Sequence, residues 1–265
     1  MSMLSYLKQS TFKANDVFIK AIQILKGHYF SIAGLCFLLF ITSNLSSYLA
    51  FRLADASGGM LKGVFCFVFV TLFFGIQLIL IKRALLLVKG VEHADFKDYI
   101  PSAKQFLNFL LGFVLYSFLL GLVYLLAALL SFPVLYLGVN METLSMEINP
   151  FLTGLIMMFV LIRITFFPYF IVDKKYNLFR ACRLSIALTR GNMLNLLLLM
   201  LVVGMAYLLQ VTFEYLGYFI LAKICSAINT FIIIPSVSLV MALAYHLMMK
   251  DYKGGDDPEL LKNII

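Results

Sequence analysis

The stretch FLNFLLGFVLYSFLLGLVYLLAALL, from Phe106 to Leu130, has no charged residue in 25 positions. An α-helix rises about 1.5 Å per residue, so about 20 such residues cross the roughly 30 Å hydrocarbon core of a bilayer. The whole chain of 265 residues has the same character, with 63% hydrophobic residues, 13% charged residues and a mean hydropathy of +0.99. Soluble domains are about half apolar and about a quarter charged. The sequence therefore predicts an all-α integral membrane protein.

Six transmembrane spans are expected. They run over Tyr29 to Phe51, Val64 to Leu87, Phe106 to Leu130, Phe151 to Val172, Met193 to Leu216, and from between Phe219 and Ile228 to Met249. The last apolar stretch is too long for one upright helix, so Tyr218 to Ala227 should form a short segment at the outer face or the start of a tilted span. Pro235 should kink that span, and Ser236 and Ser238 stand where they can bond backbone groups that the proline frees.

The start of the chain and its cysteines add little chemistry. The first apolar run begins after about 28 polar or amphipathic residues and has no A-x-A cleavage site behind it, so the first span should remain in the mature protein.

Cys36, Cys66, Cys182 and Cys225 are scattered singly, with neither CxxC metal spacing nor a disulfide pattern. We expect each cysteine to pack as a small apolar side chain.

The distribution of basic residues gives the orientation. Of the 21 Lys and Arg, 17 fall on the side of the two termini, while Arg52, Lys62 and Lys223 fall on the other side and Arg163 lies inside a span. By the positive-inside rule, both termini are cytoplasmic. The net charge of +8 therefore reflects topology first, and it also favours anionic lipid headgroups as partners. We expect no nucleic acid as a partner, because no basic stripe alternates with exposed aromatic residues on a soluble module.

The segments that precede the odd-numbered spans have an amphipathic pattern. In the first, Val17, Phe18, Ala21, Ile22 and Leu25 share one face and Lys13, Asp16, Lys20 and Gln23 the other. In the third, Leu178, Phe179, Cys182 and Ile186 are set against Arg180, Arg183 and Arg190. The second, Asp95 to Gln105, is broken by Pro101 and is the weakest example. Such helices should lie flat at the membrane interface.

Similar segment ends suggest an internal repeat. Lys26-Gly27-His28 and Arg190-Gly191-Asn192 each have a glycine placed to end an interfacial helix and turn the chain into the membrane. We expect a single six-span membrane domain over residues 1–253, built from units 12–94, 95–173 and 174–253, followed by a cytoplasmic tail, 254–265. Each unit would be an interfacial helix followed by a transmembrane hairpin. The alternative is that any membrane protein with an even number of spans forms hairpins, and that basic residues precede spans for topology alone.

Arg163 is the one strong charge inside a predicted span. Placing Arg near the middle of a membrane costs several kcal/mol. It could face inward and hold an anionic headgroup or a gate, or it could extend to the cytoplasmic face or bond to Gln77, which lies at a similar depth. We therefore take Arg163 and Gln77, with Arg180, Arg183 and Arg190, as candidate lipid-binding or ligand-binding residues.

Motifs for catalysis are not evident. The sequence has no HExxH, GxSxG, Walker loop, GxGxxG or Asp-rich cluster. His28, His93 and His246 all map to the cytoplasmic interface, and three histidines are too few for a membrane di-iron site. We expect no enzymatic activity, no catalytic residues, no metal site and no cofactor.

The segment RITFFPYFIVD, from Arg163 to Asp173, followed by LFRACRLS (178–185) and LTRGN (188–192), resembles a broad group of bacterial membrane proteins. The group includes the YciC-like proteins of unknown function and the membrane domain attached to some glycerophosphodiester phosphodiesterases. Pro168, Tyr169, Asp173, Ala181 and Ser185 match its pattern. The resemblance covers about 30 residues strongly and implies a bacterial inner (plasma) membrane. It implies no activity, because the known chemistry of the group belongs to a separate soluble phosphodiesterase domain.

These observations lead to two main functional hypotheses. The first is a non-enzymatic polytopic membrane protein that organises membrane lipids, especially anionic ones, or a membrane protein partner at the cytoplasmic leaflet. The second is a transporter or lipid-translocating protein that uses a polar intramembrane site around Arg163. A membrane enzyme comes third. A polar cavity at mid-membrane would favour the second hypothesis, and a solid bundle with Arg163 bonded to backbone would favour the first.

Overall fold

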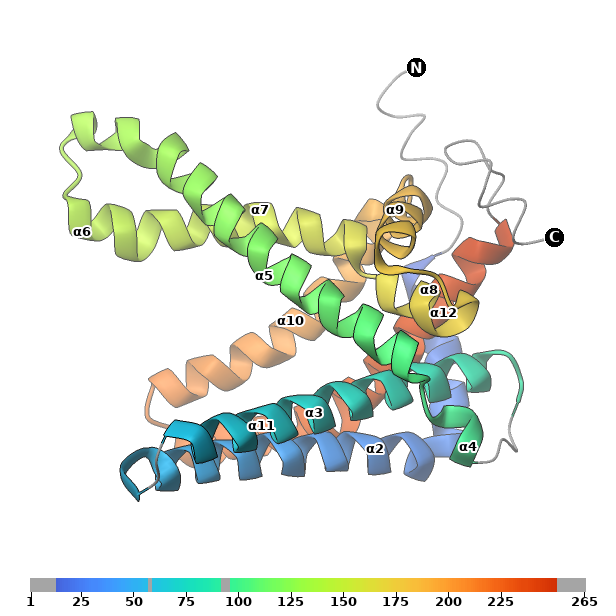
Figure 1. Cartoon of the computed structure of the whole chain (residues 1–265). Helices are drawn as coiled ribbons and strands as arrows, with labels where there is room; N and C mark the ends of the chain where they lie inside the picture. Colours follow the sequence, from blue (N-terminus) through green and yellow to red (C-terminus); the bar gives the residue numbers. More distant parts are fainter. Residues whose placement is uncertain (1–12, 57–58, 92–95, 252–265) are drawn as a thin grey trace, which may run out of the picture.

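The computed structural model describes residues 13–56, 59–91 and 96–251, and every regular element in these ranges is a helix (Figure 1). The α-helices are α2 (Ala14–Ala56), α3 (Gly59–Val88), α4 (Phe96–Tyr99), α5 (Ala103–Ser131), α6 (Met141–Thr143), α7 (Asn149–Ile164), α8 (Phe167–Lys174), α9 (Leu178–Thr189), α10 (Met193–Tyr215), α11 (Phe219–Ile228) and α12 (Ile234–Asp251). A 3₁₀ helix, η1 (Phe132–Leu137), and two π-helical turns, η2 (Leu144–Ile148) and η3 (Asn229–Ile233), connect them. The predicted tail 254–265 lies outside the described residues.

Six helical segments are long and apolar enough to cross a membrane, which confirms the predicted all-α class and the number of spans. They are Ala14–Ser46, Lys62–Val88, Lys97–Tyr136, Met141–Lys174, Met193–Tyr215 and Phe219–Lys250. Two of them are composite. The fourth joins α6, η2, α7 and α8, and the sixth joins α11, η3 and α12.

The breaks in the composite spans occur next to prolines. η2 ends two residues before Pro150, and η3 ends two residues before Pro235. Proline has no backbone N–H and its ring crowds the preceding turn, so the helix widens locally instead of continuing its regular ladder. The sixth span is therefore one segment that begins at Phe219 and has its irregularity before Pro235.

The carbonyl that Pro235 leaves without its helical donor belongs to Phe231. Tyr29 of α2 donates its hydroxyl to this carbonyl at 2.9 Å. The two serines bond other carbonyls of the same helix, Ser236 that of Ile232 at 2.6 Å and Ser238 that of Ile234 at 2.9 Å. The serines therefore bond carbonyls of their own helix beside Pro235, while the carbonyl of Phe231 is bonded from a different helix.

The two glycines predicted to turn the chain behave differently. Gly191 has φ +88°, in the left-handed region, just after α9 ends. Gly27 is not among the glycines with positive φ, and α2 continues through it to a kink at His28, where φ is −129° and ψ is 23°. The prediction is right for Gly191 and wrong for Gly27, because a bend at one residue redirects α2 without ending the helix (Figure 1).

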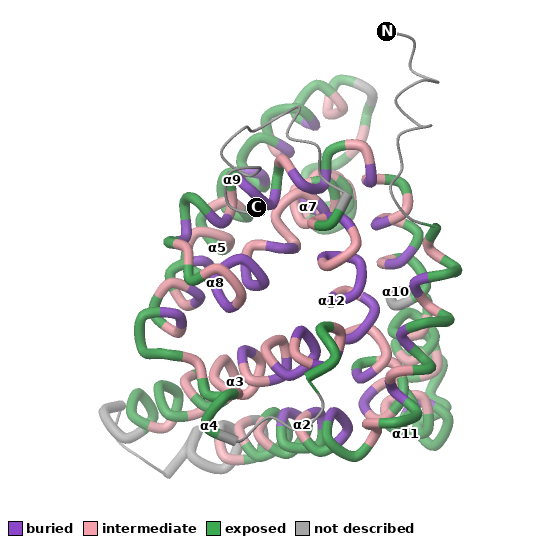
Figure 2. The backbone as a smooth tube through the Cα atoms, turned by 90° about the vertical axis from the view of Figure 1, so that its right-hand side faces the viewer, coloured by how far each residue is buried: buried purple, intermediate pink, exposed green. Residues whose placement is uncertain are grey.

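Burial is concentrated at one end of the molecule, which we call the base. It carries the buried hydrophobic cluster, with members on the first part of α2, the last turns of α3, the start of α5, the end of α7, all of α8, α9, the start of α10 and the second half of α12. Figure 2 looks onto this end and shows buried segments on α2, α3, α8 and α12. Ile32, Leu78, Phe170, Leu239 and Ala244 are fully buried there. The base therefore joins helices that are far apart in the sequence.

The opposite halves of the long helices, which we call the arms, comprise the described residues within 40–72, 113–157 and 201–228. The buried cluster includes none of these residues. In the arms, α5 packs on α7 and α10 packs on α11, and large apolar side chains such as Phe118, Leu129 and Leu208 are more than half exposed. Such surfaces are compatible with lipid as the surrounding solvent, because lipid tails are as apolar as the side chains.

Candidate functional site

Asp173, near the end of α8, joins three helices at the base. Its carboxylate forms an ion pair with the ammonium of Lys89, directly after α3. Its other oxygen accepts a hydrogen bond of 3.2 Å from the hydroxyl of Tyr245 on α12. A charge-assisted network of this kind fixes the relative positions of the helices that carry it.

Aromatic rings surround the other side of Tyr245. This tyrosine is 2% exposed, and its ring centroid lies 5.5 Å from that of Tyr169, 5.2 Å from that of Phe170 and 6.0 Å from that of Phe166. Rings at these separations attract one another beyond simple contact area. The helix is interrupted between α7, which ends at Ile164, and α8, which begins at Phe167 with Pro168 in its first turn. The three rings around Tyr245 come from the segment that begins at this break, so the break places α8 against α12.

Ser185 of α9 bridges the break between α7 and α8. Its hydroxyl accepts a hydrogen bond of 3.1 Å from the backbone N–H of Phe166 and donates one of 2.8 Å to the backbone carbonyl of Arg163. The hydroxyl of Thr189, one turn later, lies 3.0 Å from the carbonyl of Ser185, its nearest acceptor, and 3.5 Å from that of Arg163. Ser185 and Thr189 are fully buried. Thus a polar stripe on α9 replaces the hydrogen bonds that the helix loses at the break.

Gln105 ties the start of α5 to the end of α8. Its side-chain amide donates to the carbonyls of Ile171 at 3.2 Å and Val172 at 3.0 Å. Its side-chain oxygen accepts from the backbone N–H of Ser102, while the Ser102 hydroxyl accepts from the backbone N–H of Gln105. This reciprocal arrangement is a capping box. The same residue therefore begins α5 and anchors it to α8.

Arg83 is a buried cation near the end of α3. It is 6% exposed, and its guanidinium donates to the hydroxyl of Ser31 at 2.9 Å and to that of Tyr99 at 2.7 Å. It also lies 4.9 Å from the centre of the Tyr99 ring. Arg83 thereby connects α2, α3 and α4. In the sequence it stands out only as one of the basic residues that set the topology.

The structure corrects the predicted faces of the third amphipathic segment. The buried face of α9 consists of Leu178, Ala181, Leu184, Ser185, Leu188 and Thr189. Phe179 is 79% exposed and Ile186 is 47% exposed, on the same side as Arg183 and Arg190. Phe179 and Ile186 were wrongly assigned to the face opposite the arginines, because protein and lipid interiors are both apolar and hydrophobicity alone does not separate them.

The five candidate residues are not brought together into one site. The guanidinium of Arg163, on α7, donates to the backbone carbonyl of Ile186 at 3.5 Å. Gln77 lies half-buried on α3, and α3 packs on α8 more than on α7. Arg180, Arg183 and Arg190 are exposed on α9, with the guanidinium of Arg180 4.4 Å from the centre of the Tyr176 ring. The Arg163–Gln77 bond considered above is thus replaced by a bond to backbone.

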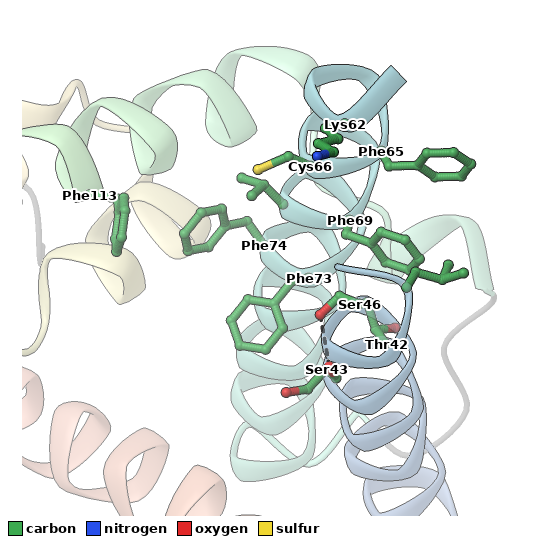
Figure 3. Close-up of a pocket in the computed structure, with 12 residues that line it drawn as sticks. Thr42, Ser43, Ser46, Lys62, Phe65, Cys66, Phe69, Phe73, Phe74 and Phe113 are labelled. Atoms are coloured by element: carbon green, nitrogen blue, oxygen red, sulfur yellow. Dashed lines mark hydrogen bonds between the residues drawn. The ribbon is translucent and has the colours of Figure 1, made fainter. Parts of the chain in front are cut away.

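One hollow beside the arms is mainly apolar. A groove of about 560 Å³ lies between α2, α3 and α5. Five phenylalanines line it together with other apolar residues, and its polar lining consists of Lys62 and three hydroxyl side chains of α2. Figure 3 shows Phe113 of α5 beside Phe74 of α3, with Ser43 and Ser46 contributed by α2. The centroids of the two phenylalanine rings are 4.9 Å apart, so these rings are in contact. Such a lining suits hydrocarbon chains rather than polar solutes.

The side chains that could bind a metal, and the cysteine thiols, are also spread over the fold. Within the described ranges, no three His, Cys, Asp or Glu side chains lie together as a metal site requires, and His93 lies outside those ranges. The four cysteines are unpaired. On α9, burial raises the pKa of the Cys182 thiol to about 11, so this group remains protonated at neutral pH.

Comparisons with protein-family models, curated proteins and solved structures found no match to this chain. The resemblance to the YciC-like group therefore stays a prediction, carried by the segment from Arg163 to Asn192. The structure gives that segment a physical role, because Pro168 breaks the helix and Ser185 bonds the groups on both sides of the break.

Proposed function

We propose that this chain is a non-enzymatic, multi-pass protein of a bacterial inner membrane, with both termini cytoplasmic, that organises anionic lipids at the cytoplasmic leaflet. A membrane protein partner bound at the same surface is the second form of this proposal. The observation that carries it is the exposed face of α9, where Phe179 and Ile186 lie among Arg180, Arg183 and Arg190.

The face of α9 is suited to an interface because its orientation is fixed. The buried side of the helix is held by Ser185 and Thr189 against the broken fourth span. Apolar side chains flanked by arginines are typical of a helix at the boundary between headgroups and acyl chains. Each arginine near an anionic surface contributes on the order of 1 kcal/mol. The three arginines together would therefore enrich anionic lipid around the base.

The internal repeat of three units is part of the same proposal. The helix pairs α2 with α3, α5 with α7 and α10 with α11 pack together, which supports hairpins within units 12–94, 95–173 and 174–253. The segment of α2 before His28, α4 and α9 would be their interfacial elements. Of these, α4 has only four residues, which agrees with the weak second pattern in the sequence.

The transporter hypothesis has less support. It would need a polar cavity at mid-membrane around Arg163, whereas Arg163 bonds the backbone of α9 and the groove between α2, α3 and α5 is lined largely by apolar residues. The hydrogen bond from Arg163 to the backbone of α9 favours the first hypothesis, in which the protein organises lipids at the cytoplasmic leaflet.

Native mass spectrometry of the full chain, released from membranes that contain phosphatidylglycerol, tests the proposal. We expect R183Q/R190Q to retain several-fold less phosphatidylglycerol than the unmodified protein, with its thermal unfolding temperature unchanged. The matched control is R183K/R190K, which keeps both charges and should retain the lipid. Equal lipid retention by the glutamine variant and the unmodified protein would contradict the proposal.

A further inference from the structure

Three lysines from separate elements converge on a second hollow of the base, away from the exposed face of α9. Lys82 comes from α3, Lys97 from α4, and Lys175 from the residue after α8; all three line a cavity of about 480 Å³. Ser102 and Gln105 at the start of α5 also line it. Cavities of about 300–1,000 Å³ are typical of small-molecule sites.

The local structure holds these lysines in place. The ammonium of Lys82 donates to the carbonyl of Ile100 at 3.0 Å, which secures it over the connection between α4 and α5. Lys175 has φ +57°, in the left-handed region that side-chain-bearing residues rarely adopt. It ends α8 there, so its position is set by the helix terminus.

The charge around this cavity is unbalanced. Lys82 interacts electrostatically with Lys175, which has the same sign, and with Asp98 of α4. Lys97 and Lys175 are exposed, and within the described part of the chain neither ammonium group has a hydrogen bond or an ion pair. Among the described residues, these three ammonium groups have one neighbouring carboxylate, that of Asp98, and an anion would neutralise the remaining positive charge.

We propose that this cavity binds a phosphate-bearing anion. Lysine ammonium groups bind phosphate as point charges with freely rotating donors, and Ser102, the N-cap of α5, adds the positive end of a long helix dipole beside the same cavity. Lys82 lies six residues before the end of the second candidate span, where such a span would approach the headgroup region. The phosphate could belong to a lipid headgroup or to a soluble phosphorylated compound, and the chemistry of recognition is the same.

The test uses the full chain in nanodiscs of neutral phosphatidylcholine. Three probes are titrated separately: dioctanoyl phosphatidic acid, dioctanoyl phosphatidylglycerol and inorganic phosphate. We expect saturable binding of at least one of them and a Kd about tenfold or more weaker in K97Q/K175Q, because each lysine contributes roughly fivefold to binding an anion. Both lysines are exposed, so the double variant should fold.

The matched control is K20Q/K26Q, which removes two exposed lysines of α2 and should leave the Kd within about twofold. Binding of a lipid probe that inorganic phosphate does not displace would assign the cavity to a headgroup, and displacement would assign it to a soluble phosphate. Absence of saturable binding by all three probes, or equal Kd values for K97Q/K175Q and K20Q/K26Q, would overturn the proposal. R183Q/R190Q should leave this binding unchanged, so the outcome is separable from that for α9.

Discussion

The base and the arms of this molecule are built from similar helices but are held together differently. At the base, hydrogen bonds connect elements that are distant in sequence, such as Tyr245 with Asp173 and Gln105 with Ile171. In the arms, polar contacts connect neighbouring helices, such as Ser131 with Asn149, and Gln210 accepts from Asn229 directly after α11. Polar bonds between distant elements are therefore a feature of the end that carries the buried cluster.

The difference has a physical cause. Lipid tails solvate apolar side chains as well as other helices do, so apolar surface alone does not draw the arms together. Hydrogen bonds, ion pairs and tightly packed rings do distinguish protein from lipid, and the base has these. We therefore expect stability to depend on the base and substitutions in the arms to be tolerated.

The sharpest test of this contrast is the same substitution in both regions. Tyr245→Ala removes a buried ring and the partner of Asp173, and we expect a loss of about 3 kcal/mol in the free energy of unfolding. Tyr207→Ala, on α10 with the tyrosine 62% exposed, should change it by less than about 0.5 kcal/mol. Unfolding titrations in mixed detergent measure both. Equal losses would show that the arms contribute to stability as much as the base does.

A second test places one methyl group at two positions of α5. A Cβ at Gly112 would lie 2.4 Å from the ring of Phe167, which itself stacks on Phe109. We expect Gly112→Ala to cost about 1–3 kcal/mol, because the packed ring must move. A Cβ at Gly121 would meet no neighbouring side chain within 4 Å, so Gly121→Ala should be neutral or stabilising by up to about 1 kcal/mol. The same unfolding titrations measure both variants. A destabilised Gly121→Ala variant, or an unaffected Gly112→Ala variant, would contradict the assignment of Gly112 to the tightly packed base and of Gly121 to the loosely packed arms.

The arms could be predicted from the sequence better than the base. Stretches such as Phe106 to Leu130 identify spans because length and lack of charge are sufficient for crossing lipid. The faces of α9 were assigned incorrectly, because Phe179 and Ile186 suit lipid as well as protein. The useful signal was the small and polar set Ala181, Ser185 and Thr189, since close contact and interhelical hydrogen bonds favour such residues.

The base also depends on residues whose sequence pattern predicts only part of their role. Ser102 and Gln105 have the S-x-x-Q spacing of a capping box, which predicts the start of α5 but not the bonds from Gln105 to the carbonyls of α8. The bend at His28 could not be derived from Gly27, because a glycine near a helix end permits a left-handed turn without requiring one. Contacts between distant helices set both features.

Removing the hydrogen bond between Tyr29 and Phe231 should have a smaller effect on the free energy of unfolding. Tyr29→Phe should cost about 1 kcal/mol, because the carbonyl freed by Pro235 loses its donor. In a Pro235→Ala background, the new backbone N–H can serve that carbonyl, so the same change should cost less. A double-mutant cycle of unfolding free energies measures the coupling. Equal costs of Tyr29→Phe in both backgrounds would reject the compensation.

The smallest expected effect concerns the side chain of Arg163. Its backbone carbonyl is bonded by buried Ser185, while its guanidinium makes a single long bond to the half-exposed Ile186 segment. The contribution of Arg163 to the fold therefore comes from its backbone, and Arg163→Leu should change the free energy of unfolding by less than about 1 kcal/mol. Ser185→Ala should cost more, about 1–3 kcal/mol, because the buried N–H of Phe166 loses its acceptor.

The comparison of these two variants also separates structure from ligand binding at Arg163. If the guanidinium holds an anionic lipid, Arg163→Leu should keep its stability and lose that lipid in native mass spectra. If it serves only α9, the lipid content should be unchanged. A loss of stability in Arg163→Leu as large as that in Ser185→Ala would contradict the backbone assignment, because it would require a buried partner for the guanidinium beyond the carbonyl of Ile186.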